Sequence, residues 1–201
     1  MPFPRLFKPL LLAAGLFSVV LLQGCATSIK ASSSTNPPPA EAFSRFGRIE
    51  LKPAVFAPGC NCEELHLKRV TANLDKNLAP SLKRWNEGPA NGRTLIIEPV
   101  VDEMTVRSPA TRLLLGPVGG SSGVLMHLNI HDADGKQVAN PEFFQQAGAW
   151  AAAYAMGVVD GTMITRVSAK ASNYLIANYE TATSIPTGYN EIAPIERPKK
   201  E

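Results

Sequence analysis

The sequence predicts an α/β or α+β domain in which a small mixed sheet of four to five strands is packed by two amphipathic helices. Both helices are predicted by apolar residues that recur at steps of three and four, over 62–85 and again over 160–179. The sheet is predicted most clearly by 124–131, where apolar and polar residues alternate as in a strand with one buried face. Of the 201 residues, 45% are hydrophobic and 18% charged, which suits one domain with a core.

A short strand at 48–52 is the first expected element, because its residues alternate between apolar and charged. The first helix follows, and the glycine, proline and asparagine residues of 88–92 end it. The next strand, 94–101, is apolar on both faces, and its Pro99 cannot donate to a ladder, so we expect an edge or a bulge there. The apolar stripe of the first helix comprises Leu67, Val70, Leu74, Leu78, Leu82 and Trp85.

A loop at 107–122 separates this strand from the alternating one at 124–131. The sequence Asp132-Ala133-Asp134-Gly135 then predicts a hairpin turn into a further strand segment at 137–139. Bound calcium is the alternative for this turn, but the spaced ligands and terminal glutamate of an EF-hand are missing. We therefore expect no calcium there.

The segment 143–157 is open between helix and strand, and its aromatic residues suit either the core or a partner surface. The second helix begins near Asp160, a suitable N-cap, and its apolar stripe is Ile164, Val167, Ala171, Tyr174 and Leu175. The polar tail 181–201 is expected to be disordered.

The first 24 residues have the order of a secretory signal peptide: Arg5 and Lys8 precede an uncharged run over 10–22. A membrane-spanning helix is the alternative, but that run is shorter than the roughly 20 apolar residues a bilayer core needs. Removing Arg5 and Lys8 from the 20 basic residues leaves 18, against 17 acidic residues. The mature chain is thus close to neutral, which argues against binding to nucleic acid.

Gly24 directly before Cys25 resembles the lipobox of bacterial lipoproteins. The resemblance implies cleavage before Cys25, a thioether-linked diacylglycerol on its sulfur, and a further acyl chain such as palmitate on its amine. Two chains suffice for stable membrane anchoring. Ala26, where inner-membrane lipoproteins of that family carry an aspartate, implies the outer membrane, with the protein facing the periplasm and the inner membrane as the alternative.

Residues 25–45 are rich in serine and proline, so we expect a lipidated N-terminus followed by a disordered tether that reaches roughly 25 Å. One α/β domain is expected over 46–180. This core resembles a family of proteobacterial envelope lipoproteins built around a domain of unknown function, distantly similar to auxiliary lipoproteins of envelope transport systems. The stretches that carry the resemblance are 95–101, 119–135 and 163–179.

That resemblance implies a non-enzymatic binding or scaffolding role in the cell envelope, through an envelope protein partner or self-association, without a cofactor. A metal-handling lipoprotein is the alternative, because Cys60, Cys62 and His66 could bind copper(I) or zinc if a fourth ligand joined them. The two thiols could equally form a disulfide with each other, bridge two molecules, or leave one thiol buried and free.

Two glycine-rich patterns suggest other chemistry. Gly119–Gly123 fits G-x-S-x-G, the turn that presents a nucleophilic serine in esterases, and Ser121 would then need His66, His127 or His131 beside it. The motif requires a following helix, whereas a strand is expected here. Residues 116–120 could bind a phosphate group, but the Gly-Lys-Ser/Thr ending of a P-loop is missing.

Overall fold

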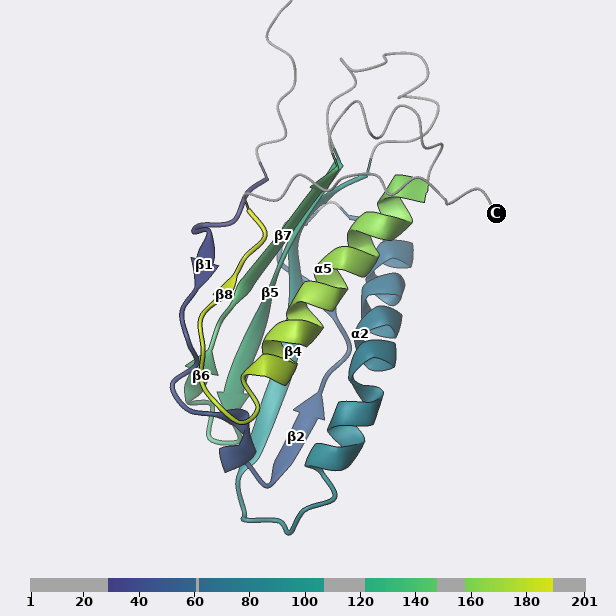
Figure 1. The fold of residues 1–201 in the computed structure, drawn as a ribbon. Coiled ribbons are helices and arrows are strands. Elements are labelled where there is room, and N and C mark those ends of the chain that lie inside the picture. Colours follow the sequence, from purple (N-terminus) through teal and green to yellow (C-terminus); the bar gives the residue numbers. More distant parts are fainter. Residues whose placement is uncertain (1–28, 61, 107–121, 148–157, 190–201) are drawn as a thin grey trace, which may run out of the picture.

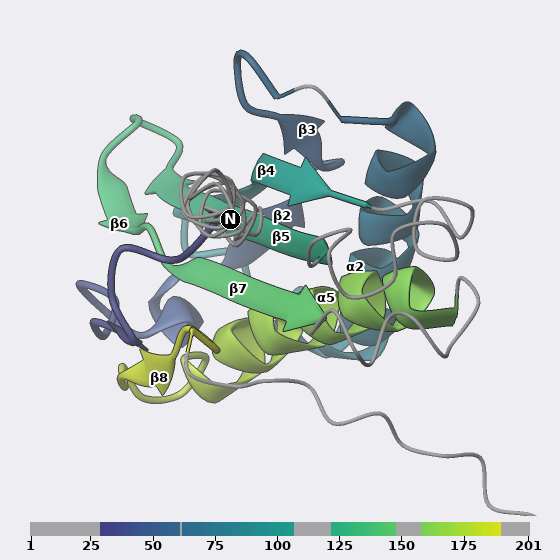
Figure 2. The same ribbon diagram turned by 90° about the horizontal axis from the view of Figure 1, so that it is seen from above.

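The structure is a computed structural model that describes residues 29–60, 62–106, 122–147 and 158–189. Two helices pack on one face of a mixed sheet (Figure 1, Figure 2). The predicted α/β class with two helices and a multi-stranded sheet is therefore confirmed. The elements in chain order are β1 (Thr35–Asn36), the 3-10 helix η1 (Phe43–Arg45), β2 (Arg48–Leu51), β3 (Val55–Phe56), α2 (Glu64–Trp85), β4 (Thr94–Thr105), β5 (Ser122–Asp132), β6 (Gln137–Ala139), β7 (Glu142–Ala147), α5 (Val158–Ala177) and β8 (Ile185–Pro186).

The long strands β4 and β5 form the centre of a six-stranded sheet. They pair antiparallel from Leu95 opposite Asp132 to Thr105 opposite Gly123. The short strands β2 and β3 pair parallel with the other edge of β4, and β6 and β7 pair antiparallel with the other edge of β5. Strands β1 and β8 form a separate two-stranded pair.

Pro99 lies inside a central strand, and the bulge of β4 falls later, between Val101 and Glu103, so neither the edge nor the bulge expected at Pro99 is found there. It pairs with Leu128 of β5. On the other edge of β4, the pairing with β2 ends at Ile97 and the pairing with β3 begins at Val100. The missing N–H of Pro99 therefore falls in the break between these two strands, where no ladder partner requires it.

The core lies between the sheet and the two helices. Every apolar position of the alternating strand β5, from Val124 to Ile130, is fully buried on this side, as predicted. The helices contribute most of the predicted stripes, with Leu67 and Leu82 only partly buried and Met163 in addition. The buried apolar residues of the two helices are Val70, Leu74, Leu78, Trp85, Met163, Ile164, Val167, Ala171, Tyr174 and Leu175.

Tyr174 is the largest fully buried side chain, and its ring packs against Phe43 and Phe143 at centroid distances of 6.3 and 5.8 Å. Burial raises the pKa of its hydroxyl well above the ordinary value, because the ionised form would lose its hydration. Phe143 belongs to β7, so the part of 143–157 that the structure describes is strand and core. Residues 148–157 lie outside the described residues.

The N-terminal segment, residues 29–45, corrects a prediction, because it packs on the domain where a disordered tether was expected. Ile29 is 5% exposed and Phe43 is 1% exposed. Within the segment β1 pairs with β8, and the backbone N–H of Ser44 donates to the carbonyl of Tyr179. The segment is fixed by contacts with residues far away in the sequence, which its local serine- and proline-rich composition does not reveal.

The predicted disorder of 181–201 is likewise wrong for residues 181–189. Thr187 is fully buried, and its backbone N–H donates to the carbonyl of Ser34, while its own carbonyl accepts from Phe144. The C-terminal residues described thus connect the N-terminal segment to β7. Neither helix in the described part of the chain has the length and apolar character needed to cross a bilayer.

Candidate functional site

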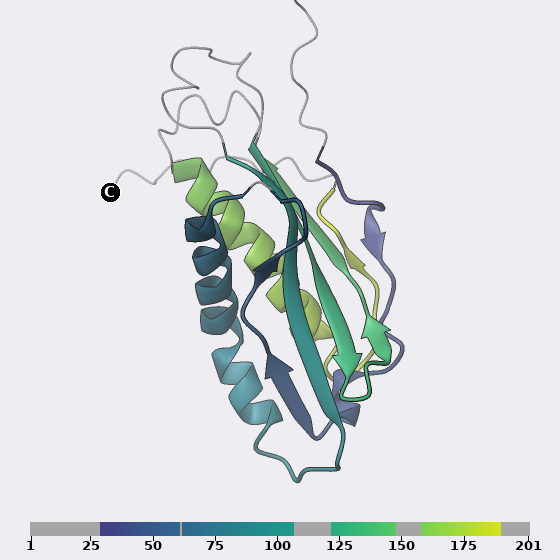
Figure 3. The ribbon, with the colours of Figure 1, turned by 180° about the vertical axis from the view of Figure 1, so that it is seen from behind.

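Figure 3 shows the face of the sheet that lies away from α2 and α5, here called the open face. This face carries a row of polar side chains. Its members, here called the polar row, are Glu98, Asp102, His127, Asn129 and His131. These residues lie on β4 and β5 and alternate with the buried core residues, because successive side chains of a strand point to opposite faces.

Short contacts join the two strands along the polar row. His127 Nδ1 lies 2.8 Å from a carboxylate oxygen of Asp102. Asn129 Nδ2 donates to Glu98 Oε2 over 2.8 Å, and His131 Nε2 lies 3.4 Å from the same oxygen. The row is therefore a pre-organised set of donors and acceptors, half-buried at each histidine and accessible from the open face.

A β-bulge in β4 lies at Asp102. Met126 pairs with Val101 and Leu125 pairs with Glu103, so Asp102 is the extra residue on β4. Asp102 faces the open side by ordinary alternation with the buried Val101, and there it meets the diagonal neighbour His127. A bulge changes the direction of the side chains that follow it, so Glu103 is exposed and Met104 lies in the core.

The N-terminal segment covers the β7 part of the open face. Ile29 and Ala31 pack on Phe144 and the partly buried Leu125. Ser32 donates from its N–H and its hydroxyl to Glu142 Oε2, over 2.8 and 2.5 Å. The polar row on β4 and β5 thus borders a covered strip.

The sulfur atoms of Cys60 and Cys62 form a disulfide in the structure, which was one of the alternatives that the sequence left open. They line an open cavity of about 530 Å³ together with Ile29 and the 102–105 end of β4. Paired sulfurs cannot act as thiolate ligands, since the nucleophilic and metal-binding form is the free thiolate.

His66 does not join these sulfurs in a metal centre. It is 8% exposed, and its Nε2 lies 3.6 Å from Glu63 Oε2. Within the described ranges no three His, Cys, Asp or Glu side chains are arranged to hold a metal ion. Metal handling by Cys60, Cys62 and His66 stays a hypothesis about the reduced protein. Titration with copper(I) and zinc, beside Cys60→Ser, would test it.

The G-x-S-x-G pattern of the esterase hypothesis runs into the start of β5. Ser121 lies outside the described residues, as do residues 116–120 of the phosphate-loop pattern. Strand β5 begins at Ser122, which confirms that a strand follows the G-x-S-x-G pattern where the esterase turn requires a helix. His127 and His131 lie on a sheet face, each beside a carboxylate, and neither lines the cavity at the disulfide. Cys25, the predicted lipidation site, also lies outside the described residues.

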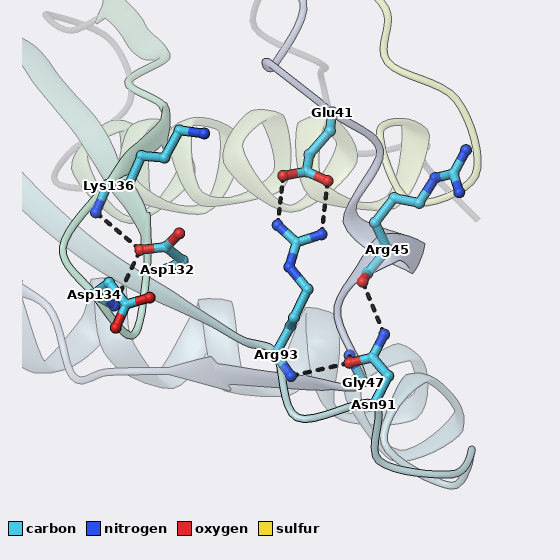
Figure 4. A network of polar contacts seen from close by, with 8 residues as sticks. All are labelled: Glu41, Arg45, Gly47, Asn91, Arg93, Asp132, Asp134 and Lys136. Atoms are coloured by element: carbon cyan, nitrogen blue, oxygen red, sulfur yellow. Dashed lines mark hydrogen bonds and ion pairs between the residues drawn. The ribbon is translucent and has the colours of Figure 1, made fainter.

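The acidic turn after β5 has a structural role, as predicted. Asp132 Oδ1 accepts hydrogen bonds from the backbone N–H groups of Asp134 and Lys136, over 3.1 and 2.9 Å (Figure 4). Gly135 adopts a φ of 80°, which favours glycine. The carboxylate that calcium would need is thus committed to the turn.

A second network beside this turn fixes the N-terminal segment (Figure 4). Arg93 donates to both carboxylate oxygens of Glu41, over 2.9 and 2.6 Å, and its guanidinium lies 4.2 Å from the centroid of the Phe46 ring. The hydrogen bond from Arg93 holds the pKa of Glu41 below its usual range. These charges have structural partners, so we do not assign them to binding.

The sequence places His127 and His131 on a water-facing strand face but does not single out Glu98 and Asp102. Glu98 stands within a stretch that is otherwise apolar, and Asp102 lies beyond the expected end of that strand. Which side chains they meet depends on the pairing register of β4 and β5. A window of local sequence does not contain that register.

No protein-family model and no curated protein matches the chain. Two solved structures show a distant similarity. One is a PelC dodecamer from Paraburkholderia phytofirmans in space group C2, with 11% identity, a TM-score of 0.35, and coverage of 66% of this chain and 90% of that chain. The other is a PelC dodecamer from the same organism in space group P6, with 12% identity, a TM-score of 0.33, and coverage of 66% and 91%. Such low TM-scores assign neither a family nor a function.

Proposed function

We propose that the protein is a lipoprotein of the bacterial outer membrane, held by acyl chains on Cys25 and facing the periplasm. In this proposal it acts as a non-enzymatic binding or scaffolding component of the cell envelope. The order of its first 25 residues supports the location, because a basic start, an uncharged run and a small residue directly before a cysteine have the pattern of an export signal with a lipidation site.

The polar row is the observation that carries the binding role. The helices cover one face of the sheet, and the N-terminal segment covers the β7 strip of the other face. The described part of the open face that remains carries Glu98, Asp102, Asn129 and two histidines in fixed positions. Ordered hydrogen-bonding groups on a rigid sheet favour specific recognition of a partner, since little side-chain entropy is lost on binding.

Cross-linking from the open face tests the binding role. A photo-activated cross-linking residue replaces Asn129 in the polar row, and in a matched control it replaces Asn173, which is exposed on α5. We expect a covalent adduct with one envelope protein, or with a second copy of the chain, at position 129 and not at 173. No protein adduct at 129, or the same adducts at both positions, would contradict the proposal.

Mass spectrometry tests the anchor separately. Trypsin cleaves after Lys30, so an acylated protein yields the peptide 25–30 with diacylglycerol on Cys25. Cys25→Ser is expected to lose the lipid and leave the membrane-bound lipoprotein fraction. An unmodified thiol at position 25, or a chain that still begins with Met1, would show that the location is wrong.

A further inference from the structure

The buried start of the N-terminal segment sets the distance between the domain and its predicted lipid anchor. Ile29 is 5% exposed and packs on Phe144, next to Leu125. Hydrogen bonds to Glu142 hold the next residues, from Ser32 to Asn36. The chain is therefore fixed to the sheet from Ile29 onward.

Only three residues, 26–28, separate Cys25 from Ile29. An extended chain advances at most about 3.6 Å per residue, so the Cα atoms of Cys25 and Ile29 lie within about 14 Å of each other. A disordered tether from 25 to 45 would have reached roughly 25 Å on average and allowed any orientation. The short connection restricts the domain to orientations in which Ile29 is close to the lipid.

Ile29 lies near one end of the sheet, here called the proximal end, where β4 ends, β5 begins and β7 ends. It lines the cavity that also contains Cys60, Cys62 and Thr105. Helix α2 begins at this end with Glu64 and runs the length of the sheet (Figure 1, Figure 3). At the other end, Asn86 bonds to the backbone of Ile49 at the start of β2.

The distal end, formed by the turns at 86–93 and 132–136, lies far from the anchor. Leu125, beside Ile29, is seven residues from Asp132 on β5, which corresponds to about 24 Å at 3.4 Å per residue. This distance exceeds the reach of residues 25–29. A membrane that holds Cys25 is thus close to the proximal end and distant from the distal end, unless the sheet lies flat on it.

The chemistry of the open face argues against a flat arrangement. That face exposes the carboxylate of Glu98 at the middle of the sheet, which would meet lipid phosphates of like charge. The proximal half exposes two large apolar side chains beside the carboxylates of Glu63 and Glu64. Leu65 in the first turn of α2 is 55% exposed, and Tyr189 beside Phe144 is 39% exposed. The end-on contact therefore rests on the short connection between Cys25 and Ile29.

The geometry points to a bilayer-facing surface at the proximal end, with the sheet upright on the membrane and the open face turned sideways toward other periplasmic proteins. This inference rests on the proposed lipidation of Cys25. Its partner is the phospholipid headgroup surface. It also assigns a role to the N-terminal segment, which transmits the position of the anchor to the orientation of the domain.

Three exposed lysines on α2 give a matched test, because Lys68, Lys76 and Lys83 lie at increasing distance from the proximal end. The first and last are 15 residues apart, or about 22 Å along the helix. Each is changed to cysteine in the acylated full chain, labelled with a fluorophore without reductant, and bound to vesicles of phosphatidylethanolamine and phosphatidylglycerol that carry a headgroup quencher. A fourth label at Asp134 reports on the distal end of the open face.

We expect quenching to fall several-fold from Lys68 to Lys83, with Asp134 close to background. Equal quenching along α2, including none at all positions, would overturn the inference, as would strong quenching at Asp134. Acylation of peptide 25–30 and flotation with the vesicles are measured on the same samples. Loss of both would overturn the proposed lipid anchor as well, whereas their presence with a flat profile overturns the orientation alone.

A linker variant shows whether the short connection causes the orientation. Twenty glycine and serine residues inserted between Ser28 and Ile29 extend the average reach to roughly 25 Å. Acylation and flotation should persist, while the difference between Lys68 and Lys83 should largely disappear. An unchanged difference would mean that the domain binds the membrane by itself, and the role given to the N-terminal segment would be wrong.

Discussion

Replacing Asn36 with alanine tests whether the N-terminal segment is an integral part of the fold. Asn36 is 3% exposed and pairs with the backbone of β7 through both ends of its amide. Its Nδ2 donates to the carbonyl of Glu142 over 2.7 Å, and its Oδ1 accepts from the Glu142 N–H over 2.8 Å. Alanine leaves both backbone groups of Glu142 without these partners.

The expected loss follows from those two hydrogen bonds. A buried donor or acceptor left without its partner costs about 1–3 kcal/mol, so the loss of both partners in Asn36→Ala should lower the free energy of unfolding by about 2–6 kcal/mol. That is a large share of the roughly 5–15 kcal/mol that stabilises a typical domain. Asn36→Asp keeps an acceptor but turns a buried carboxylate oxygen toward the carbonyl of Glu142, so a loss at least as large as that of Asn36→Ala is expected.

Urea unfolding of the mature chain, followed by far-ultraviolet circular dichroism, gives the free energy. Hydrogen exchange at Phe144, whose N–H donates to Thr187, reports whether the segment opens locally. Asn173→Ala, an exposed change of the same type on α5, should stay within about 0.5 kcal/mol of the wild type. A loss below about 1 kcal/mol for Asn36→Ala, with unchanged exchange at Phe144, would refute the attachment of the segment.

Three further changes test the core, the Glu41 network and the C-terminal turn. Because burial raises the folded-state pKa of Tyr174 above 10.0, wild-type stability should be full below pH 10 and fall above it, and Tyr174→Phe should reduce that fall in alkaline urea titrations. Because the pKa of Glu41 is lowered in the folded state, its ionised carboxylate stabilises the fold above pH 4.5, and this stabilisation is lost as the pH falls. Glu41→Gln should therefore lower the urea midpoint at pH 7 and leave it unchanged in strong acid. Gly188→Ala should cost about 1–3 kcal/mol in the same assay, because φ is +88° and a Cβ would lie 2.6 Å from the carbonyl of Phe144, whereas Gly88→Ala meets nothing within 4 Å.

The periodic elements could be predicted because each carries its own signal. The stripe of α2 and the alternation of β5 repeat over enough residues to fix both the type of element and its buried face. The hairpin turn at Asp132 was predictable for the same reason, since its hydrogen bonds are local. Their bounds shift by a few residues, with α2 beginning at Glu64 where 62 was expected.

The polar row could not be predicted as a unit, because its contacts join two strands whose register is a tertiary property. His127 meets Asp102 because the register places His127 opposite Val100, which is two residues before Asp102 on the same face of the sheet. A strand slipped by one residue would have turned either side chain into the core. Local sequence thus predicts which residue types lie on the open face, but it does not predict which side chains of β4 and β5 contact each other.

The N-terminal segment is ordered although its composition predicts disorder, and this order changes the role of the proposed lipid anchor on Cys25. The buried apolar residues of the segment, Ile29 and Phe43, are separated by a serine- and proline-rich run, so no window of sequence contains enough hydrophobic surface to predict order. The run itself forms hydrogen bonds to β7 and β8 through backbone groups and the amide of Asn36. Every chain carries such backbone groups, so their presence in the sequence does not distinguish an ordered segment from a disordered one. A lipid attached to a flexible tether would only concentrate the domain at the membrane. A lipid on Cys25, with only three residues between it and a fixed segment, would also limit the orientation of the sheet, and with it the direction in which the polar row is presented.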